Sequence, residues 1–314
     1  MPEPASNAAA PHIPLIVVAG PTASGKTALA LSLADALGGE IVNFDSVQLY
    51  RDFDVGSAKP AAEEMARVPH HLVGVADAQA PWTAGEYARR ARPLIEAIAA
   101  RGRTPVLVGG TGFYLRALLE GLSPQPAGQA ELRAKLRRRT PERLHRLLAR
   151  LDPESAARIA PRDTSKVIRA LEVRLLTGRP MASSWRAQPP EAWGAVRAVK
   201  LGLMPERAAL YARIHRRAEA MFAGPIQEET RRLLPLYAED LRIWTSHGYK
   251  QAVDLELRGA ELAPALAEAQ QEQRHYAKRQ WTWFRRDPAM HWLHGFGDDA
   301  AIQAEALAWV RERL

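Results

Sequence analysis

The chain has 314 residues, 47% of them hydrophobic and 25% charged, which is the composition of an ordinary soluble protein with one large core or two smaller ones. It contains no cysteine, which excludes a disulfide framework and a thiolate metal site, and no apolar run long enough to cross a bilayer. The formal net charge of +8 favours anionic partners, nucleic acid first, although plain solubility is the alternative explanation.

Residues 1–14 are rich in Ala and Pro and lack the order of a signal peptide. We therefore expect residues 1–12 to form a disordered tail, and the protein to be cytoplasmic.

A phosphate-binding loop follows this tail. Residues 14–19 (PLIVVA) predict a buried strand, and residues 27–37, with Leu29, Leu33 and Leu37 on one face, predict a helix that ends at Gly38-Gly39. Between them lies GPTASGKT, the GxxxxGK[ST] pattern, in the strand–loop–helix setting that the pattern needs. The predicted diphosphate-binding residues are Gly20, Pro21, Thr22, Ala23, Ser24, Gly25, Lys26 and Thr27.

The chemistry of this loop follows from its residue types. Backbone amides and the helix N-terminus attract an anion, Lys26 reaches the distal phosphates, and the Thr27 hydroxyl is placed for Mg²⁺. The motif does not distinguish ATP from GTP or another diphosphate.

The first third of the chain alternates strand and helix patterns. Residues 40–46 predict a strand ending in a carboxylate, residues 84–101 a helix, and residues 104–108 a buried strand followed by Gly-Gly-Thr-Gly at 109–112. This alternation predicts an α/β fold with a parallel, doubly wound sheet. Ligands of such sheets lie beyond the carboxyl ends of the strands, where three segments converge: the loop, Asp45-Ser46 and residues 109–112.

The pattern changes near residues 123–126. From there to Pro189-Pro190 the sequence predicts helices only, one of them capped by Asp163 or Thr164 and ending at Gly178. Residues 195–203 alternate apolar and polar side chains and predict a return to the sheet, and Leu210, Ile214 and Met221 line one face of a later helix. We therefore expect a helical insertion at 122–194 within a core formed by 13–121 and 195–314.

The predicted insertion carries a dense basic segment between residues 131 and 150, opposed only by Glu131 and Glu142. A polyanion explains this density better than a solvated helix face does. Its eight basic residues are Arg133, Lys135, Arg137, Arg138, Arg139, Arg143, Arg146 and Arg150.

Asp45 and Thr111 have several possible roles. Asp45 is either a magnesium ligand or a general base for a second substrate, and the plain alternative is a cap that bonds the following amides. Its place at the sheet edge favours function. Thr111 offers a hydroxyl and nearby amides to a phosphate, or else lies in a turn that needs glycine only for its geometry.

Two further segments invite a functional interpretation. His70-His71 suggests a metal, but adjacent histidines diverge and no third ligand is near, so a structural or substrate-facing role is favoured. Residues 278–286 interleave basic and aromatic side chains, which suits phosphates and unstacked bases. A C-terminal helix with aromatics in the core is the alternative.

Taken together, the motifs resemble those of the tRNA dimethylallyltransferase (tRNA isopentenyltransferase) family over nearly the whole chain, from about residue 13 to 293. They are GPTASGKT at 20, DSVQLYRD at 45, GSAKP at 56, PHHL at 69, VGGTGFYLRALLEGLSP at 108, IRALEV at 168, HGYKQA at 247 and AKRQWTWFRR at 277.

The resemblance implies transfer of a dimethylallyl group from dimethylallyl diphosphate to the N6 amine of the adenosine 3′ of the anticodon, in tRNAs reading codons beginning with U. It also implies a P-loop core with a helical insertion, and a loop that holds a prenyl diphosphate. Mg²⁺ is the expected cofactor, with Thr27 as ligand, and the tRNA anticodon stem-loop is the expected partner of a protein that we expect to be monomeric.

The resemblance also assigns roles to residues. Asp45 aligns with the catalytic aspartate, Thr111 and Arg217 with residues near the diphosphate, and Arg133 with a position associated with activity. Ser46 and Gln48 align with residues that recognise the target adenosine. The implied tRNA-binding residues are Asp45, Ser46, Val47, Gln48, Ser165, Lys166, Val167, Ile168, Arg169, Lys278, Arg279 and Gln280. Two positions depart from the family pattern: Ser57 stands where Thr is usual, and Pro225 where an apolar residue is typical.

Two alternatives stay open at this stage. A small-molecule kinase would use the same loop with ATP and Asp45 as base, although the basic insertion counts against it, and no Asn-Lys-x-Asp motif for guanine is present. A non-catalytic RNA-binding protein would keep the loop as a relic.

Overall fold

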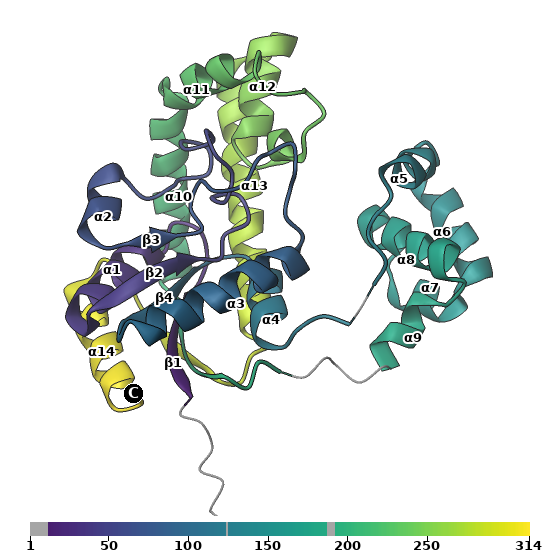
Figure 1. Cartoon of the computed structure of the whole chain (residues 1–314). Coiled ribbons are helices and arrows are strands. Elements are labelled where there is room, and N and C mark those ends of the chain that lie inside the picture. The colour runs from purple at the N-terminus through teal and green to yellow at the C-terminus, as the bar shows by residue number, and fades with distance from the viewer. Residues whose placement is uncertain (1–11, 124, 187–191) are drawn as a thin grey trace, which may run out of the picture. The chain divides into compact units, whose positions relative to one another are not determined.

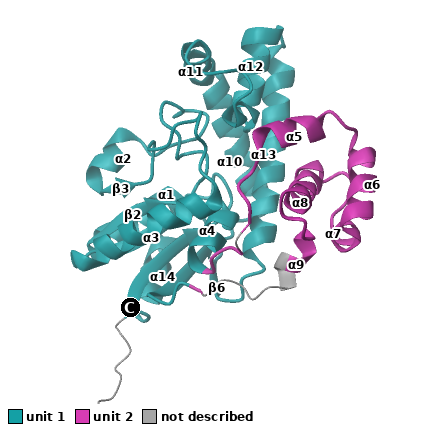
Figure 2. Ribbon diagram, turned by 45° about the vertical axis from the view of Figure 1, so that its right-hand side comes forward, with its two compact units in different colours: residues 1–119, 193–314 teal, residues 120–192 magenta. Residues whose placement is uncertain are grey.

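The computed structural model describes residues 12–123, 125–186 and 192–314, so the expected N-terminal tail and the boundary at Pro189-Pro190 lie outside the described residues. The chain forms two compact units (Figure 2): unit 1 comprises residues 1–119 and 193–314, and unit 2 comprises residues 120–192. The sequence pattern placed both junctions two residues further along the chain.

Unit 1 is built on a six-stranded sheet whose neighbouring strands all pair in parallel, in the order β3-β2-β4-β1-β5-β6. The sheet confirms the predicted parallel α/β fold. Its strands are β1 (Ile13–Ala19), β2 (Gly39–Asn43), β3 (His70–His71), β4 (Thr104–Gly109), β5 (Val196–Leu203) and β6 (Met290–Leu293).

The sheet is buried on both faces because its central strands are almost wholly apolar. In β1, Ile16 and Val18 pack with α1 (Lys26–Leu37) and α14 (Ala300–Arg311), whereas Leu15 and Val17, also completely buried, point to the opposite face. On that opposite face the Tyr87 hydroxyl of α3 (Ala84–Ala100) donates to the carbonyl of Asn43 at 3.0 Å.

Long helices follow strand β5 in the chain. α10 (Arg207–Phe222) and α13 (Leu262–Phe284) pack side by side, and Figure 1 shows them running up to α11 (Pro225–Leu233) and α12 (Tyr249–Arg258). The expected apolar face of α10 is buried. Unit 1 also contains α2 (Ala62–Arg67), α4 (Gly112–Leu119) and the 3₁₀ helix η1 (Arg242–Thr245).

Unit 2 contains helices and no strand among its described residues. The predicted helix with an Asp163 cap and a Gly178 end is confirmed as α8, where Gly178 has φ +69°, a conformation that suits glycine at a helix C-terminus. The helices are α5 (Ala130–Arg137), α6 (Pro141–Leu151), α7 (Pro153–Arg158), α8 (Thr164–Thr177) and α9 (Met181–Arg186).

The chain leaves and re-enters unit 1 at one place, where the Trp193 amide donates to the carbonyl of Leu119 at 2.8 Å. Beside this pair, Arg92 donates to the carbonyl of Leu118 and lies over the Trp193 ring. Among the residues that the structure describes, no helix has the length and hydropathy needed to cross a membrane.

Candidate active site at the carboxyl edge of the sheet

Three loops meet where β1, β2 and β4 end, as the sequence predicted. They are the phosphate-binding loop at 20–27, residues 45–48 and residues 109–112. A direct hydrogen bond joins the second and third loops, and the Gln280 side chain bridges the first and third. These contacts connect the loops at the carboxyl edge of the sheet into one site.

The phosphate-binding loop folds around the carbonyl of Pro21, which accepts from Lys26 Nζ at 2.7 Å and from Ser24 Oγ at 2.9 Å. Gly25 precedes α1 with φ +85°, and a Cβ there would lie 2.8 Å from the amide nitrogen of Gly297. Only glycine fits this position without strain, because the loop turns left-handed there and a second backbone lies against it.

Two cations and one carboxylate govern the electrostatics of the site. Burial lowers the pKa of Lys26 to about 8, opposed by the Asp45 carboxylate and reinforced by Arg217. Burial also lowers the pKa of Arg217, again opposed by Asp45. Two poorly solvated cations that share one carboxylate favour a polyanionic ligand, which would neutralise them.

Arg217 reaches the loop from α10, as its expected diphosphate role requires. Its Nη2 donates to the Thr22 hydroxyl at 2.6 Å and to Oε1 of Gln273 at 3.4 Å. Its buried Nε has no hydrogen-bond partner among the described residues. A buried donor without a partner loses hydration, so it favours an anionic ligand at this place.

Asp45 makes the capping contact that was one of the roles offered by the sequence. One carboxylate oxygen, Oδ1, accepts from the Val47 amide at 2.9 Å, which is the capping role. The other, Oδ2, lies on the side of Gly110, 3.7 Å from where a Cβ of that glycine would stand. The Asn43 side chain fixes the backbone of Asp45 through its Oδ1 and Nδ2. The capping bond therefore orients the carboxylate, with Oδ2 on the side of the 109–112 loop.

Thr111 joins the second and third loops. Its hydroxyl accepts from the Ser46 amide at 3.0 Å and donates to Ser46 Oγ at 3.2 Å. The Tyr276 side chain lies beside Thr111 and Gln280, and burial, with the nearby Asp45 carboxylate, raises the pKa of its phenol. Tyr276 and Gln273 belong to this site but carry no local sequence signal, because helix α13 lies more than 150 residues further along the chain.

Gln280 joins the first and third loops. Its Oε1 accepts from the Thr22 amide at 2.8 Å, and its Nε2 donates to the carbonyl of Gly110 at 3.1 Å. The residue is 4% exposed. Its side chain therefore connects two loops of the site, whereas the neighbouring Lys278 and Arg279 are exposed.

The aromatic residues of 278–286 divide between core and surface. Trp281 and Phe284 are buried, while Trp283 is 39% exposed and lies edge-on to Phe113, which is 47% exposed. Trp283 also covers Gly112, where a Cβ would lie 2.0 Å from Cδ1 of the ring. An exposed aromatic pair next to Thr111 and beside exposed basic residues suits an unstacked base.

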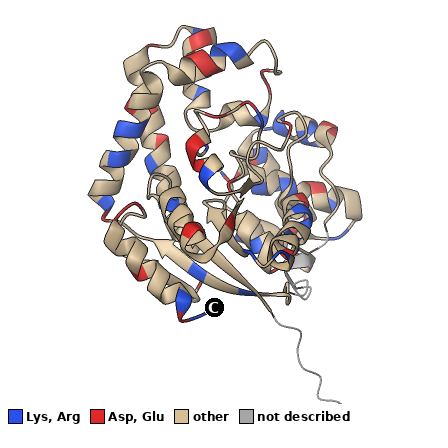
Figure 3. Cartoon of the chain, turned by 60° about the vertical axis from the view of Figure 1, so that its left-hand side comes forward, with Lys and Arg blue, Asp and Glu red and all other residues tan. Residues whose placement is uncertain are grey.

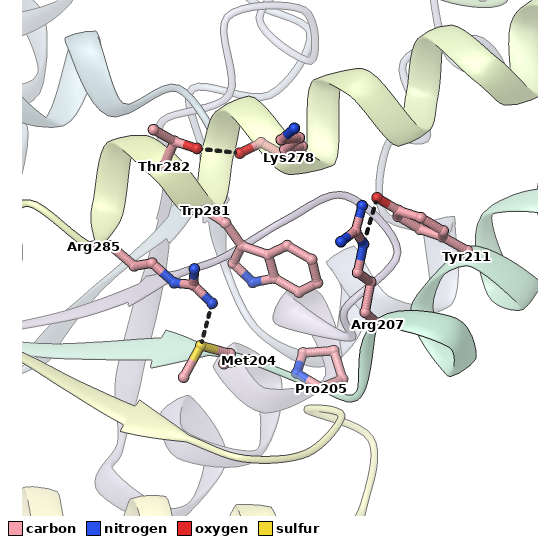
Figure 4. Close-up of a pocket in the computed structure, with 8 residues that line it drawn as sticks. All are labelled: Met204, Pro205, Arg207, Tyr211, Lys278, Trp281, Thr282 and Arg285. Atoms are coloured by element: carbon pink, nitrogen blue, oxygen red, sulfur yellow. Dashed lines mark hydrogen bonds between the residues drawn. The ribbon is translucent and has the colours of Figure 1, made fainter.

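A pocket of about 290 Å³ opens between α10 and α13, close to the end of β5 (Figure 4). Trp281 and Met204 give it an apolar floor, and the carbonyl of Leu203 beneath accepts from Trp281 Nε1 at 3.4 Å. Eight residues line it, three of them basic and none acidic. The lining residues are Met204, Pro205, Arg207, Tyr211, Lys278, Trp281, Thr282 and Arg285. The pocket adds to the cationic character of this edge of unit 1.

The residues available for Mg²⁺ are few. No group of three or more His, Cys, Asp or Glu with metal-binding geometry occurs in the part of the chain that the structure describes. Mg²⁺ commonly takes one or two protein oxygens and completes its shell with phosphate oxygens and water. The partly exposed Thr27 hydroxyl, at the start of α1, fits that sparse protein contribution.

His70 and His71 have structural partners. His71 Nε2 lies 2.7 Å from Oε2 of the buried Glu40, which also pairs with Arg101 at 2.8 Å. His70 Nδ1 lies 2.7 Å from the carbonyl of Val68. These contacts, on the short edge strand β3, fit the structural one of the two roles, structural or substrate-facing, that the sequence favoured.

In unit 2, Arg133 forms a bidentate pair with Glu172, through Nε at 2.9 Å and Nη2 at 2.8 Å. Glu172 is completely buried and also accepts from Arg169 and from the Gln129 amide. Burial acts to raise the pKa of Glu172, but these hydrogen bonds outweigh it and hold the pKa below its usual value. Arg133 therefore has a structural partner inside unit 2.

The segment 165–169 presents alternating environments along α8. Ser165 and Lys166 are exposed, and Arg169 donates to the carbonyl of Pro126 at 2.9 Å as well as to Glu172. Val167 and Ile168 lie in the apolar core of unit 2. Only the polar members of this segment are placed to contact a ligand through their side chains.

Most of the basic segment 131–150 is solvent-exposed, and Figure 3 marks its Lys and Arg residues in blue. Seven of its eight cations are exposed, and none of these seven forms an ion pair with a residue that the structure describes: Lys135, Arg137, Arg138, Arg139, Arg143, Arg146 and Arg150. Such unneutralised charge favours a polyanion over internal pairing.

The two departures from the family pattern fit their surroundings. Ser57 Oγ donates to the carbonyl of Phe53 at 2.7 Å, a contact that needs only a hydroxyl. Pro225 is the first residue of α11, a position where its missing amide costs nothing.

Comparison with known proteins finds similar sequences over nearly the whole chain. The IPP transferase family model matches residues 48–287, and the isopentenyl transferase model matches residues 13–73. A tRNA dimethylallyltransferase of Koribacter versatilis is 51% identical, over 95% of this chain and 98% of the relative, and one of Solibacter usitatus is 49% identical, over 96% and 99%.

Solved structures are similar over nearly the same length. The full-length tRNA isopentenylpyrophosphate transferase of Bacillus halodurans has a TM-score of 0.69 and 34% identity, covering 95% of this chain and 97% of that one. A eukaryotic dimethylallyltransferase described as acting on tRNA has a TM-score of 0.75 and 25% identity, covering 92% and 75%.

Proposed function

The chain belongs to the IPP transferase family of tRNA-modifying enzymes, and on that premise we propose that it transfers a dimethylallyl group from dimethylallyl diphosphate to the N6 amine of an adenosine in tRNA. We further propose that this adenosine is the one 3′ of the anticodon in tRNAs that read codons beginning with U. The main observation in support of this reaction is that Asp45 lies close enough to Lys26 and Arg217, at one edge of the sheet, to interact with both charges.

The proposed reaction forms one bond and breaks another at the same carbon. The N6 nitrogen attacks the first carbon of the allyl group, and the carbon–oxygen bond breaks, leaving its electron pair on diphosphate. Asp45 Oδ2 takes a proton from N6, because the adenine amine is a weak nucleophile until that proton leaves. Lys26, Arg217 and the loop amides stabilise the negative charge that develops on the leaving oxygen.

Mg²⁺, when bound, would lower the charge of the diphosphate oxygens, and the Thr27 hydroxyl is the protein oxygen that we propose as its ligand. Apart from the two substrates, every other group in the proposed mechanism belongs to this chain.

The acceptor must leave the anticodon-loop stack to reach a partly buried carboxylate, so we propose that the adenosine flips into the site. Ser46 and Gln48 are proposed to contact its base, Phe113 and Trp283 to stack on an unpaired base, and the exposed cations of unit 2 to bind stem phosphates. Arg133 would support the tRNA surface through Glu172. Of the expected tRNA-binding residues, 45–48, Ser165, Lys166, Arg169, Lys278 and Arg279 are proposed to contact the tRNA, and the buried Val167, Ile168 and Gln280 are proposed to support them.

The relatives do not favour the kinase alternative, because the named proteins transfer prenyl groups and match over nearly the whole chain. A non-catalytic relic is also disfavoured, since Lys26, Asp45 and Arg217 lie together with hydrogen-bonded supports. We propose that the enzyme acts as a cytoplasmic monomer, and sedimentation of the purified protein would test its oligomeric state.

A transfer assay tests the proposed function. The protein is incubated with Mg²⁺, radiolabelled dimethylallyl diphosphate and an unmodified tRNA that has adenosine 3′ of its anticodon. We expect label in that adenosine, and a loss of turnover of about 10²–10⁴-fold in Asp45→Ala with little change in tRNA affinity. Asp240→Ala, at an exposed position, is the matched control. ATP consumption without label transfer would contradict the proposal.

A further inference from the structure

A buried carboxylate outside the reaction centre holds the segment 53–58. Glu229 of α11 is 5% exposed and accepts from the amides of Asp54 and Val55, each at 2.8 Å, and from the amide of Gly56 at 3.4 Å. The Tyr249 hydroxyl donates to the same carboxylate. A carboxylate that receives several donors is fixed in place, and it fixes the backbone that supplies them.

Tyr249 and its aromatic neighbours secure the same segment. A Cβ at Gly56 would lie 2.5 Å from Cζ of Tyr249, so the ring rests directly on this backbone. Phe53 is completely buried and contacts three aromatic rings, with centroid distances of 5.0 Å to Tyr237, 5.2 Å to Trp244 and 5.4 Å to Tyr249. The start of the segment is therefore attached to α11, η1 and α12 and has little freedom to move.

The end of the segment holds the side chain of Gln48. Gln48 Nε2 donates to the carbonyl of Ala58 at 2.8 Å and to that of Ser57 at 3.4 Å. Two carbonyls at one end of a carboxamide identify that end as the NH₂ group. Ala58 has φ +52°, a conformation that non-glycine residues keep only where their surroundings impose it.

The orientation of Gln48 decides what it can recognise. With Nε2 bound to two carbonyls, its Oε1 accepts no hydrogen bond from the residues that the structure describes, so the free end is an acceptor. Gln48 follows Asp45 by three residues, and the Asp45–Val47 hydrogen bond fixes the turn between them. An acceptor beside the reactive carboxylate suits a base that carries an exocyclic amine and disfavours one that carries an oxo group.

We propose that Glu229 is a positioning residue, which sets amine specificity by holding residues 54–58 so that Gln48 offers Oε1 to the acceptor base. The inference rests on the proposed function. An amine has two hydrogens, so one can be accepted by Gln48 while the proton of the other passes to Asp45. If the segment loosens, the carboxamide can rotate and offer its NH₂ end, which would accommodate an oxo group.

The test compares two anticodon stem-loops that carry adenosine or inosine at the target position. Binding of each is measured for the wild type, Glu229→Gln and the control Glu228→Gln, which makes the same change at the neighbouring exposed position. We expect the wild type and Glu228→Gln to prefer adenosine equally, and Glu229→Gln to lose about tenfold or more of this preference. Hydrogen exchange should also become faster at the amides of Asp54 and Val55 in Glu229→Gln alone.

An unchanged preference in Glu229→Gln would overturn the inference, whether or not the amides exchange faster. If that variant does not fold, Tyr249→Phe decides, because it removes one donor to Glu229 and keeps the ring; an unchanged preference there would equally reject the inference. If the wild type transfers no label, the proposed function fails. If the wild type transfers label but Glu229→Gln keeps the full preference for adenosine, only this inference fails.

Discussion

The side-chain Nε2 of Gln280 donates to the carbonyl of Gly110 at 3.1 Å, and Oε1 of the same side chain accepts from the backbone amide of Thr22. A methyl group at residue 110 would lie 2.0 Å from Gln280 Nε2. The lack of a side chain at Gly110 is therefore what allows the phosphate-binding loop and the 109–112 loop to be connected.

We expect Gly110→Ala to displace Gln280 and to lower kcat/KM for transfer by about 10²-fold, because a shift of about 1 Å in a reactive site has that effect. Steady-state kinetics with dimethylallyl diphosphate as the varied substrate would measure it. Gly85→Ala, in α3, has no clash in its environment and should keep wild-type kinetics. Wild-type kinetics in Gly110→Ala would show that the Gln280 connection is dispensable.

Lys26 makes diphosphate binding depend on pH. Its pKa is lowered to about 8, so above pH 8 the free protein carries a largely neutral amine that must gain a proton when an anion binds. The diphosphate group itself is ionised by pH 7. We expect affinity for dimethylallyl diphosphate to be level below pH 8 and to fall above it by up to about tenfold per pH unit.

Calorimetry in buffers of different ionisation enthalpy should detect proton uptake at pH 9 and little at pH 7. Lys26→Arg should remove the pH dependence, because a guanidinium stays charged throughout this range. Lys135→Arg, on α5, should leave it unchanged. An affinity in the wild type that is equal at pH 7 and pH 9 would contradict the assignment.

The Arg133–Glu172 pair gives a stability prediction for unit 2. Arg133→Ala removes two of the hydrogen bonds to a completely buried carboxylate, and we expect about 3 kcal/mol of destabilisation, measured by hydrogen exchange of amides in α5 and α8. Lys135→Ala, exposed on the same helix, should change stability by less than about 0.5 kcal/mol. A stable Arg133→Ala that nonetheless loses transfer would indicate direct substrate contact instead.

The sign of the accompanying pH effect follows from the lowered pKa of Glu172. The contribution of this carboxylate to the free energy of unfolding is fully present above its ordinary pKa of 4.5. This contribution is lost as the pH falls through the lower pKa of the folded state. Acid should therefore loosen unit 2 in the wild type, and Glu172→Gln should reduce that pH dependence.

The exposed cations of unit 2 predict the salt dependence of tRNA binding. Changing Arg137, Arg138 and Arg139 together to Gln should weaken binding and reduce the slope of log K against log salt by about two to three, since each phosphate contact contributes about 0.7–0.9. Arg311→Gln, exposed on α14, is the control. An unchanged slope in the triple variant would exclude these residues from the interface.

Local patterns predicted the parts of the fold that depend on local chemistry. The apolar run before the phosphate-binding loop forms β1, and Asp163 and Gly178 cap the two ends of α8. The strands β3 and β6 were missed, because two residues at an edge and the four residues of MHWL show no period of their own. Their pairing with β2 and β5 supplies the order that the sequence lacks.

Long-range contacts explain the structural roles that sequence reasoning could not assign. Gln280 bonds to Thr22 across 258 residues, and Glu229 bonds to Asp54 across 175. The sequence around Gln280 does not indicate a contact with Thr22, and the sequence around Glu229 does not indicate a contact with Asp54. By contrast, Lys26 and Asp45 were identified because the loop pattern and the strand end are both local features.

The hydrogen bond between Trp193 and Leu119 has a consequence for how the molecule assembles. Strand β5 must return to β1 across most of the chain, and the entropy lost in closing a loop grows with the logarithm of its length, about 0.6 kcal/mol for each doubling. A unit 2 that is already folded, with its ends together, would take residues 120–192 out of that loop. Prior folding of unit 2 would therefore remove the closure entropy that its own residues add to this loop, so the insertion need not slow the completion of the sheet.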